Sequence, residues 1–428
     1  MICVKSHSAE SFLEALRATS SLTNLSLDES FIGEAPPSYR AVFTEYLRIT
    51  TTLTTLTIVA CNKLQDSLKY VLEGLLANNT VLKVNLTNFI VDKASAKLVS
   101  KIFEQNMTVK AFNMISTRQD VEMLESDMYD DWLQTLTENK TLDAVRLPFC
   151  AGKGKHWGEF FAILPSKRNL KVTIEMNFTH YDVLPQICKA LKEAGAEEQV
   201  FFETNFPPNS ADMLDYKGFS EIYACLRSDT RNEFLRIMQK LCSASHVTSV
   251  QLGVSSHAVD DSLVSAVADY IRSTLTLQKL HLILYCDPAF LVPRNGFLKA
   301  IILSLAQNAS VKELHMKVPE MENEEIDLLA RTVKSLQNIQ RMYFVPERAR
   351  DANRFFSVLS EDIASNYTLL SLTVDVSVDE VQAARDWFLV WDTTRRNSGL
   401  LNRAALFVSG TRCDRPCGEA VEWMCRHP

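Results

Sequence analysis

A short pattern of apolar and polar positions, L-x-x-L-x-L, recurs along the chain. Its last two apolar positions flank one variable residue, and this alternation predicts a β-strand with one buried and one exposed face. Neighbouring copies lie 28–34 residues apart, except between residues 145 and 250, so the chain is predicted to be a repeat protein. The central apolar residues of the ten copies are Leu25, Leu56, Val84, Phe112, Val145, Val250, Leu280, Leu314, Met342 and Leu372.

Between these strands the apolar positions change to the period of a helix. Leu68, Val71 and Leu75 share one helical face, and Ile326 and Val333 do so in a later copy. Each unit is therefore predicted to be a strand followed by a helix. A single unit cannot bury its apolar stripe, so the units are expected to stack into one continuous core.

The extent of the repeat pattern divides the chain into two predicted parts. Residues 1–378 are expected to form a solenoid of about eleven or twelve repeats of 28–34 residues. Residues 174–246 are irregular, and the stretch before Val250 holds either one long repeat or two degenerate ones. Residues 379–428 leave the pattern and predict a helical C-terminal cap. Its first helix contains Val381, Ala384, Trp387, Phe388 and Trp391, and a separate second helix contains Leu400, Leu401, Ala404, Ala405 and Val408.

Strand–helix units of this length resemble leucine-rich repeats of the ribonuclease-inhibitor-like class, and they are similar to the repeat region of innate immune receptors. The resemblance implies an α/β fold, a curved solenoid with a parallel sheet on the concave side and helices on the convex side. It also implies a role in recognition. In the family an Asn or Cys ends each strand, and only Cys61 and Cys150 match it here. The other residues at this position cannot build an unbroken hydrogen-bonded ladder, so an irregular solenoid is expected.

Composition narrows the class of protein. With only 12 glycines and 13 prolines, the chain is a poor candidate for a doubly wound enzyme or a β-barrel. A net charge of −7 gives no basic surface for nucleic acid. We expect a cytoplasmic protein that binds no membrane, because the N-terminus lacks the apolar core of a signal peptide and no apolar run is long enough to span a bilayer. Ten scattered cysteines fit reduced thiols, and the repeat accounts for most of the Asn-x-Ser/Thr sequons at Asn24, Asn78, Asn85, Asn106, Asn139, Asn177, Asn308 and Asn366.

The variable positions of the strands identify a candidate binding site. These residues point away from the core, onto the open face of the sheet. In the N-terminal half they are small and neutral, whereas in the C-terminal half cations, imidazoles and an aromatic ring coincide. Adjacent strands lie about 4.8 Å apart, so these side chains are expected to form one partner-binding patch. Its predicted members are Lys279, His281, Lys312, His315, Lys317, Arg341 and Tyr343.

These features favour a non-catalytic scaffold that recognises an acidic or phosphorylated protein partner, with no cofactor and no small-molecule ligand. No hydrolase or metalloprotease motif is present, and an unrecognised enzyme is the least favoured interpretation. The resemblance is also compatible with a GTPase regulator similar to the Ran GTPase-activating proteins, an inhibitor of the ribonuclease-inhibitor class, or the substrate-recognition subunit of a ubiquitin ligase. We expect no bound metal. A weak candidate for a zinc site consists of Cys413, Cys417, Cys425 and His427.

Overall fold

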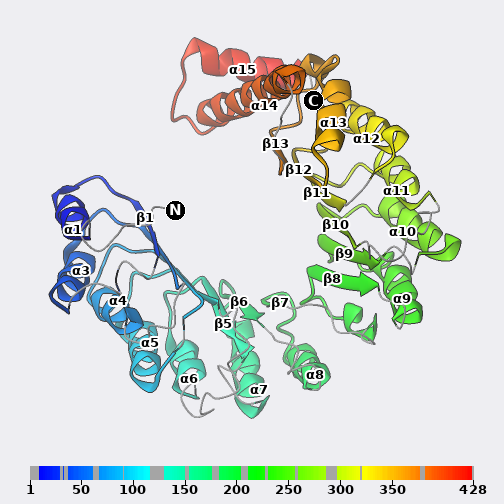
Figure 1. Ribbon diagram of the computed structural model, residues 1–428. Coiled ribbons are helices and arrows are strands. Elements are labelled where there is room, and N and C mark those ends of the chain that lie inside the picture. The colour runs from blue at the N-terminus through cyan, green and yellow to red at the C-terminus, as the bar shows by residue number, and fades with distance from the viewer. Residues whose placement is uncertain are drawn as a thin grey trace. The chain divides into compact units, whose positions relative to one another are not determined.

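Parallel strands alternate with helices throughout the computed structural model (Figure 1). The chain divides into two compact units, Met1–Asn205 with Tyr216–Phe219, and Phe206–Asp215 with Ser220–Pro428. The structure describes residues 9–28, 32, 37–60, 67–89, 91–115, 130–149, 154–175, 183–203, 211–226, 230–255, 259–285, 296–318, 321–375 and 381–426.

Unit 1 contains a seven-stranded sheet in which each strand pairs with the next along the chain. Its strands are β1 (Asn24–Asp28), β2 (Thr55–Val59), β3 (Lys83–Thr87), β4 (Ala111–Ile115), β5 (Ala144–Pro148), β6 (Lys171–Glu175) and β7 (Val200–Glu203). Its helices are α1 (Ala9–Ala18), α3 (Pro37–Ile49), α4 (Ser67–Leu76), α5 (Lys93–Gln105), α6 (Asp130–Glu138), α7 (Gly154–Ile163), the 3-10 helix η5 (Leu164–Ser166) and α8 (Leu184–Ala194).

Unit 2 contains a six-stranded sheet that is built in the same way. Its strands are β8 (Glu221–Leu226), β9 (Ser249–Ser255), β10 (Lys279–Tyr285), β11 (Glu313–Val318), β12 (Arg341–Pro346) and β13 (Ser371–Val374). Its helices are η7 (Ala211–Asp215), α9 (Arg231–Leu241), α10 (Asp261–Ser273), α11 (Phe297–Leu305), α12 (Asn323–Ser335), α13 (Ala349–Ser360), η9 (Ile363–Ser365), α14 (Val381–Val408) and α15 (Arg415–Arg426).

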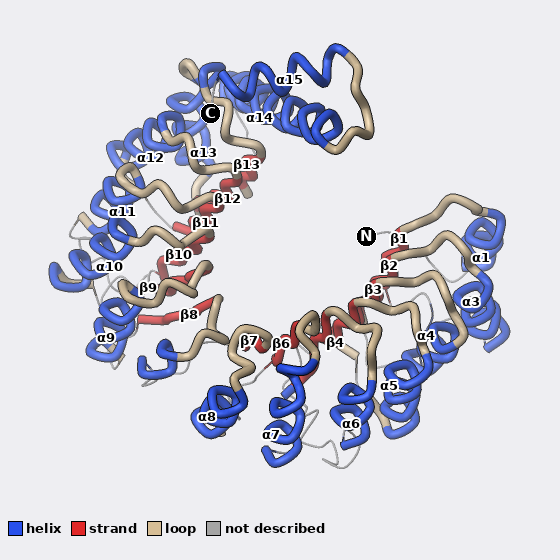
Figure 2. Tube along the Cα trace, turned by 180° about the vertical axis from the view of Figure 1, so that it is seen from behind, coloured by secondary structure: helices blue, strands red, loops and turns tan. Residues whose placement is uncertain are grey.

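In each unit the helices cover one face of the sheet and leave the other face open (Figure 2). The alternation of the strand residues explains this arrangement. Leu56 and Ile58 of β2 are fully buried, whereas the residues between and beside them are partly exposed. The same alternation recurs in β10, where Leu280, Leu282 and Leu284 are buried. The α/β fold of parallel repeats predicted from the sequence is therefore confirmed.

The irregular stretch of the sequence contains three strands. The weak matches around residues 170–174 and 200–202 are β6 and β7, and the sequence pattern did not locate β8. Ile222, Ala224 and Leu226 are its buried residues, so a small alanine stands where a leucine was sought. The stretch before Val250 thus contains two units. The first is short, and among the described residues between β7 and β8 the 3-10 helix η7 stands in place of an α-helix.

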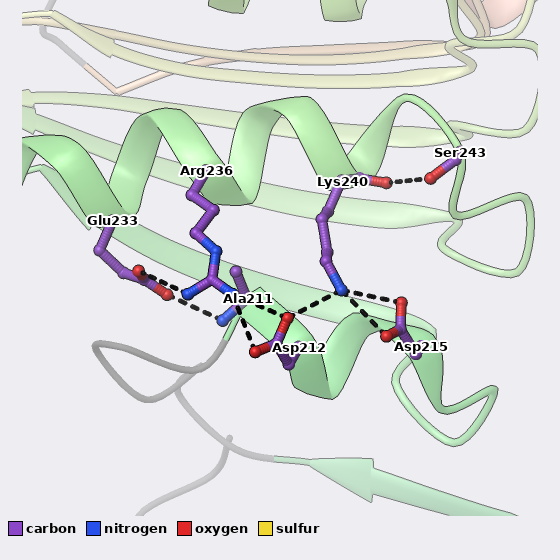
Figure 3. Close-up of polar contacts among 7 residues, drawn as sticks. All are labelled: Ala211, Asp212, Asp215, Glu233, Arg236, Lys240 and Ser243. Atoms are coloured by element: carbon purple, nitrogen blue, oxygen red, sulfur yellow. Dashed lines mark hydrogen bonds and ion pairs between the residues drawn. The ribbon is translucent and has the colours of Figure 1, made fainter.

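A cluster of charges fastens η7 to α9 (Figure 3). The guanidinium of Arg236 donates to both carboxylate oxygens of Asp212, at 2.9 and 2.8 Å. The Lys240 ammonium donates to Asp215 at 3.0 and 2.9 Å and lies 3.0 Å from Asp212. The backbone N–H of Ala211 donates to Glu233 at 2.8 Å. This network adds to the buried contacts of Ala211, Met213 and Leu214 in η7.

Buried asparagines join successive repeats. Asn78 donates its side-chain N–H to the carbonyl of Leu47 at 2.6 Å, and its Oδ1 accepts from the N–H groups of Thr80 and Val81 at 2.9 and 2.7 Å. Asn106, Asn308 and Asn366 make equivalent bonds to the repeats before them. A buried ladder of side-chain amides therefore precedes β3, β4, β11 and β13. Cys61 and Cys150, which match the family pattern at the strand end, lie outside the described residues.

The ladder continues where the asparagine is replaced. Gln199 donates to the carbonyls of Lys167 and Leu170 at 2.7 and 3.2 Å, and the Lys167 ammonium donates to the carbonyl of Asn139. The ladder also explains the sequons: Asn78, Asn106, Asn308 and Asn366 are only 3–6% exposed. Their amides are already bonded inside the fold, where an attached glycan has no room.

The C-terminal helices differ from the sequence prediction in one respect. The two helices expected before residue 408 are a single 28-residue helix, α14, and a further helix, α15, follows it. Gly399 was the only glycine available to interrupt the helix, and its backbone stays helical there. The predicted domain boundary at residue 378 lies outside the described residues, so the division into solenoid and cap stays a prediction.

Candidate functional site

The open face of the six-stranded sheet brings the predicted site residues into rows. Strands β10, β11 and β12 pair in parallel and in register, so Lys279, Glu313 and Arg341 lie side by side. The next outward-facing row is His281, His315 and Tyr343, and the third contains Lys317 between Ile283 and Val345. Six of the seven predicted residues therefore stand on three adjacent strands, as the repeat spacing implied.

The central row is a continuous set of ring contacts. The rings of His281 and His315 meet edge to face with centroids 5.0 Å apart. His315 in turn meets Tyr343 at 5.6 Å, and 37% of the surface of Tyr343 is exposed. Rings in contact leave one another fewer rotamers than isolated rings would have. Such preorganisation lowers the entropy lost on binding.

The charges beside this row are mixed and not purely basic. Glu313, which the sequence prediction left out of the site, lies 3.7 Å from the guanidinium of Arg341. Its carboxylate is mostly covered, with 20% of the side chain exposed, whereas 60% of the Arg341 side chain is exposed. Lys279 and Lys317 are also exposed. The signal for Glu313 was present in the sequence, because it occupies the same lane as Lys279 and Arg341.

Lys312 occupies a different position from the other predicted members. It precedes β11, and its backbone bonds to that of Gln278 at 2.8 Å and accepts from Gln340 and Arg341 at 2.8 and 3.0 Å. Its exposed side chain thus belongs to the end of the sheet and not to the rows on its open face. Lys312 therefore borders the site.

Burial changes the titration of one imidazole. His281 is partly covered, and this desolvation, followed by the charge of His315, lowers its pKa below the usual value. At neutral pH the His281 ring is therefore uncharged. An acidic group placed against it would reverse the shift, because a nearby negative charge favours the imidazolium.

A tyrosine pair extends the site and was missed by the sequence prediction. Tyr223 stands in the same row as His281, two strands away, and its hydroxyl lies 3.4 Å from that of Tyr285. Gly253 lies between them: an added Cβ would be 3.1 Å from the Tyr285 ring and 3.2 Å from the Tyr223 hydroxyl. The glycine therefore lets the two rings meet over β9. Burial and the bond to Tyr285 raise the pKa of Tyr223, so its hydroxyl stays protonated at neutral pH.

The open face of the seven-stranded sheet uses its polar groups internally. Asn85 donates to Thr57 at 2.9 Å and accepts from Asn113 at 2.8 Å. Arg146 pairs with Glu203, with 2.6 Å between nitrogen and oxygen. These amides and this guanidinium are therefore bonded within the sheet, whereas Lys83 beside them is exposed.

The C-terminal cysteines do not gather into a site within the described part of the chain. Cys417 is buried, whereas Cys413 and Cys425 are exposed, and all three are free thiols. A hydrogen bond to Asp414 raises the pKa of Cys417, which disfavours the thiolate that zinc requires. No group of three or more His, Cys, Asp or Glu residues suited to a metal occurs among the described residues, and His427 lies outside them.

No helix in the segments that the structure describes combines the length and the apolar character that a bilayer span requires.

Leucine-rich repeat proteins are among the solved structures to which the chain is similar. One is the leucine-rich repeat-containing protein LegL7 from Legionella pneumophila, at 12% identity over 86% of this chain and 97% of that one, with a TM-score of 0.35. Another, from the crystal structure of the TLR13–ssRNA13 complex, has 12% identity over 85% of this chain and 50% of that one, with a TM-score of 0.34. A third, PH0766 from Pyrococcus horikoshii OT3, has 11% identity over 89% and 85%, with a TM-score of 0.22.

No protein-family model and no curated protein sequence matches the chain. Structural scores as low as these carry no argument about function.

Proposed function

We propose that the protein is a non-catalytic recognition scaffold of the ribonuclease-inhibitor-like class of leucine-rich repeats. In this proposal, the open face of the six-stranded sheet binds a segment of a partner protein. The observation that carries it is the row of ring contacts from His281 through His315 to Tyr343, with the exposed Arg341 beside it. Tyrosine and arginine are typical anchors of protein interfaces, and here strand pairing holds them in place.

The charges of the site favour an acidic or phosphorylated segment. Lys279, Lys317 and Arg341 are exposed, whereas the acidic neighbour Glu313 is mostly covered. Arg341 meets Glu313 only at 3.7 Å, so its donors remain available for shorter contacts. Carboxylate or phosphate oxygens would form charge-assisted hydrogen bonds with this guanidinium.

A cytoplasmic location is part of the proposal. It is supported by the free cysteines among the described residues and by the buried position of the sequon asparagines. A disulfide found in the protein isolated without reductant, by differential thiol alkylation and mass spectrometry, would contradict it.

The binding proposal is tested with a fluorescent peptide library in which glutamate-rich and phosphoserine peptides are matched with neutral ones of equal length. Acidic peptides should bind and neutral ones should not. Arg341→Ala with Tyr343→Ala should weaken binding by ~2 kcal/mol or more, the scale of a hot-spot loss. Thr55→Ala with Lys83→Ala is the matched control, because it also removes one charge and one hydroxyl from an open sheet face, in the other unit. Equal losses from both pairs, or preference for neutral peptides, would contradict the assignment.

A further inference from the structure

The outer face of α14 carries large apolar side chains that the fold leaves uncovered. Trp387 and Trp391 are each 41% exposed, and Phe388 and Leu389 are 54% and 53% exposed. The two tryptophan rings stack at 6.3 Å, Phe388 meets Trp391 at 5.7 Å, and the Arg395 guanidinium lies 5.3 Å from the Trp391 ring. We call Trp387, Phe388, Trp391 and Arg395 the α14 patch; Leu389 lies on another side of the helix.

The patch lies where a stack of repeats ends. Each of the helices α10 to α13 packs against a helix before it and a helix after it. The first part of α14 continues this stack: Ala383 and Val390 are buried, and Asn397 donates to the carbonyls of Asn366 and Leu369 at 3.1 and 2.9 Å, as the ladder asparagines do. Phe388 and Arg395 lie on the side of α14 opposite Val390, where the next helix of a stack would pack, and the two tryptophans lie on the flank between these sides.

The end of a solenoid normally has a polar outer face, which keeps it from associating. Here that face is aromatic, and α15 does not cover it. Gly418 of α15 lies against Phe407, in the last turn of α14 and far along the helix from Trp387. A contiguous aromatic surface rimmed by charges is typical of an interaction site.

Two exposed charges show which occupant fits. Arg385 and Asp392 are seven positions apart, so both lie beside Phe388 on the outer face of the helix. If two α14 helices pack antiparallel about a two-fold axis near Phe388, Arg385 of each copy lies opposite Asp392 of the other. The patch is thus complementary to itself in charge as well as in apolar character, which is the requirement of an isologous interface.

We propose that the α14 patch binds the same patch of a second copy of this chain, as an antiparallel helix pair. The contact is separate from the open face of the six-stranded sheet, so either site can exist without the other. Dimerisation would present two such faces to a partner that carries two acidic segments.

Sedimentation velocity over a range of protein concentrations tests this dimer. The wild-type chain should sediment as a dimer, and Phe388→Glu should weaken self-association about tenfold or more, because it puts a charge at the centre of the patch. The control is Leu303→Glu, at a 44% exposed position of α11 in the same unit, which should leave the association unchanged. Circular dichroism of each variant checks that it is folded.

Charge reversal separates this pairing from non-specific association. Arg385→Asp alone and Asp392→Arg alone should each yield monomers, because each sets two pairs of like charges against one another. Mixing these two variants should restore a heterodimer, and the double variant should restore a homodimer. A wild-type chain that stays monomeric, self-association that ignores both reversals, or a patch that binds only a different protein would overturn the proposal.

Discussion

At the scale of single residues, the buried asparagine that precedes several of the strands has the clearest physical role. Asn308 is 3% exposed and donates to the carbonyls of Ile271 and Thr274, in the preceding repeat, at 2.7 and 3.0 Å. Its Oδ1 accepts from the N–H groups of Ser310 and Val311, both at 2.8 Å. One side chain therefore satisfies four backbone groups that the turn would otherwise bury without partners.

Removing this side chain should be costly. Asn308→Ala leaves buried donors and acceptors unsatisfied, each worth about 1–3 kcal/mol, so we expect the free energy of unfolding to fall by ~3 kcal/mol. Asn24→Ala is the control: Asn24 also begins a sequon, but its side chain is exposed and donates to the hydroxyl of its neighbour Thr23. Urea unfolding compares the two, and a cost for Asn308→Ala as small as that for Asn24→Ala would contradict the role of the ladder.

A second prediction concerns His281 and pH. Its pKa in the folded protein lies below the unfolded value because burial disfavours the charged ring. The contribution to stability is therefore fully present above the unfolded pKa, about 6.5, and is lost as the pH falls toward the folded pKa. We expect urea unfolding to show lower stability at about pH 5.5 than at about pH 7.5, with a smaller difference in His281→Gln. A larger difference in the variant would show that the sign is wrong.

The same shift affects binding. Because an acidic ligand favours the imidazolium, the proposed peptide contact should tighten as the pH falls below about 6.5, and His281→Gln should remove part of this dependence. NMR titration of the His281 ring, free and peptide-bound, measures the two pKa values directly. A bound-state pKa equal to or below the free one would contradict an acidic ligand at this ring.

At the scale of elements, the sequence predicts a strand well where its apolar template is intact. Each of the ten predicted central residues lies in a strand, because alternation forces register: a shift by one residue would expose every buried side chain. Strand β8 was missed, since Ala224 replaces a large apolar residue and η7 replaces the preceding helix. Tyr223 was missed with it. Tyr285 lies beyond the template at the end of β10, so nothing in the pattern indicated that Gly253 lets the two tyrosines meet.

This tyrosine pair should depend on the absence of a side chain at Gly253. In Gly253→Ala the new methyl group would lie 3.1 Å from Tyr285 and 3.2 Å from Tyr223, so the rings must separate. We expect a loss of ~1 kcal/mol in stability, typical of modest overpacking. Gly399→Ala, in α14, is the control, because no atom lies within 4 Å of its added Cβ. There alanine should stabilise the helix by about 0.5–1 kcal/mol, and the same sign in both variants would contradict the argument.

At the scale of the whole molecule, the sequence predicted the kind of fold but not its division. The period and the alternation give parallel strand–helix units, because only stacking buries their apolar stripes. In the short unit after β7, ion pairs of Asp212 with Arg236 and Lys240 add to the buried apolar contacts of η7, and apolar periodicity carries no signal for them. The rows of site residues on β10, β11 and β12 could be predicted, because the repeat period and the strand register together place them. The α14 patch could not, because the sequence pattern indicated two helices where the structure has the single helix α14 at the end of the stack.

Two units with separate sheets imply that damage in one sheet spreads within it first. Leu314 is 1% exposed and pairs in register with Leu280 and Met342, so Leu314→Asp buries an unpaired charge and should cost several kcal/mol. Hydrogen exchange followed by mass spectrometry should show lost protection first in β10, β11 and β12, then across the rest of unit 2, while β1 to β6 keep their protection. The control is Thr373→Asp, an exposed position on the open face of β13, which should leave all strands protected. Simultaneous loss of protection across both sheets in Leu314→Asp would mean that the two units unfold as one cooperative body, as expected of a single continuous solenoid.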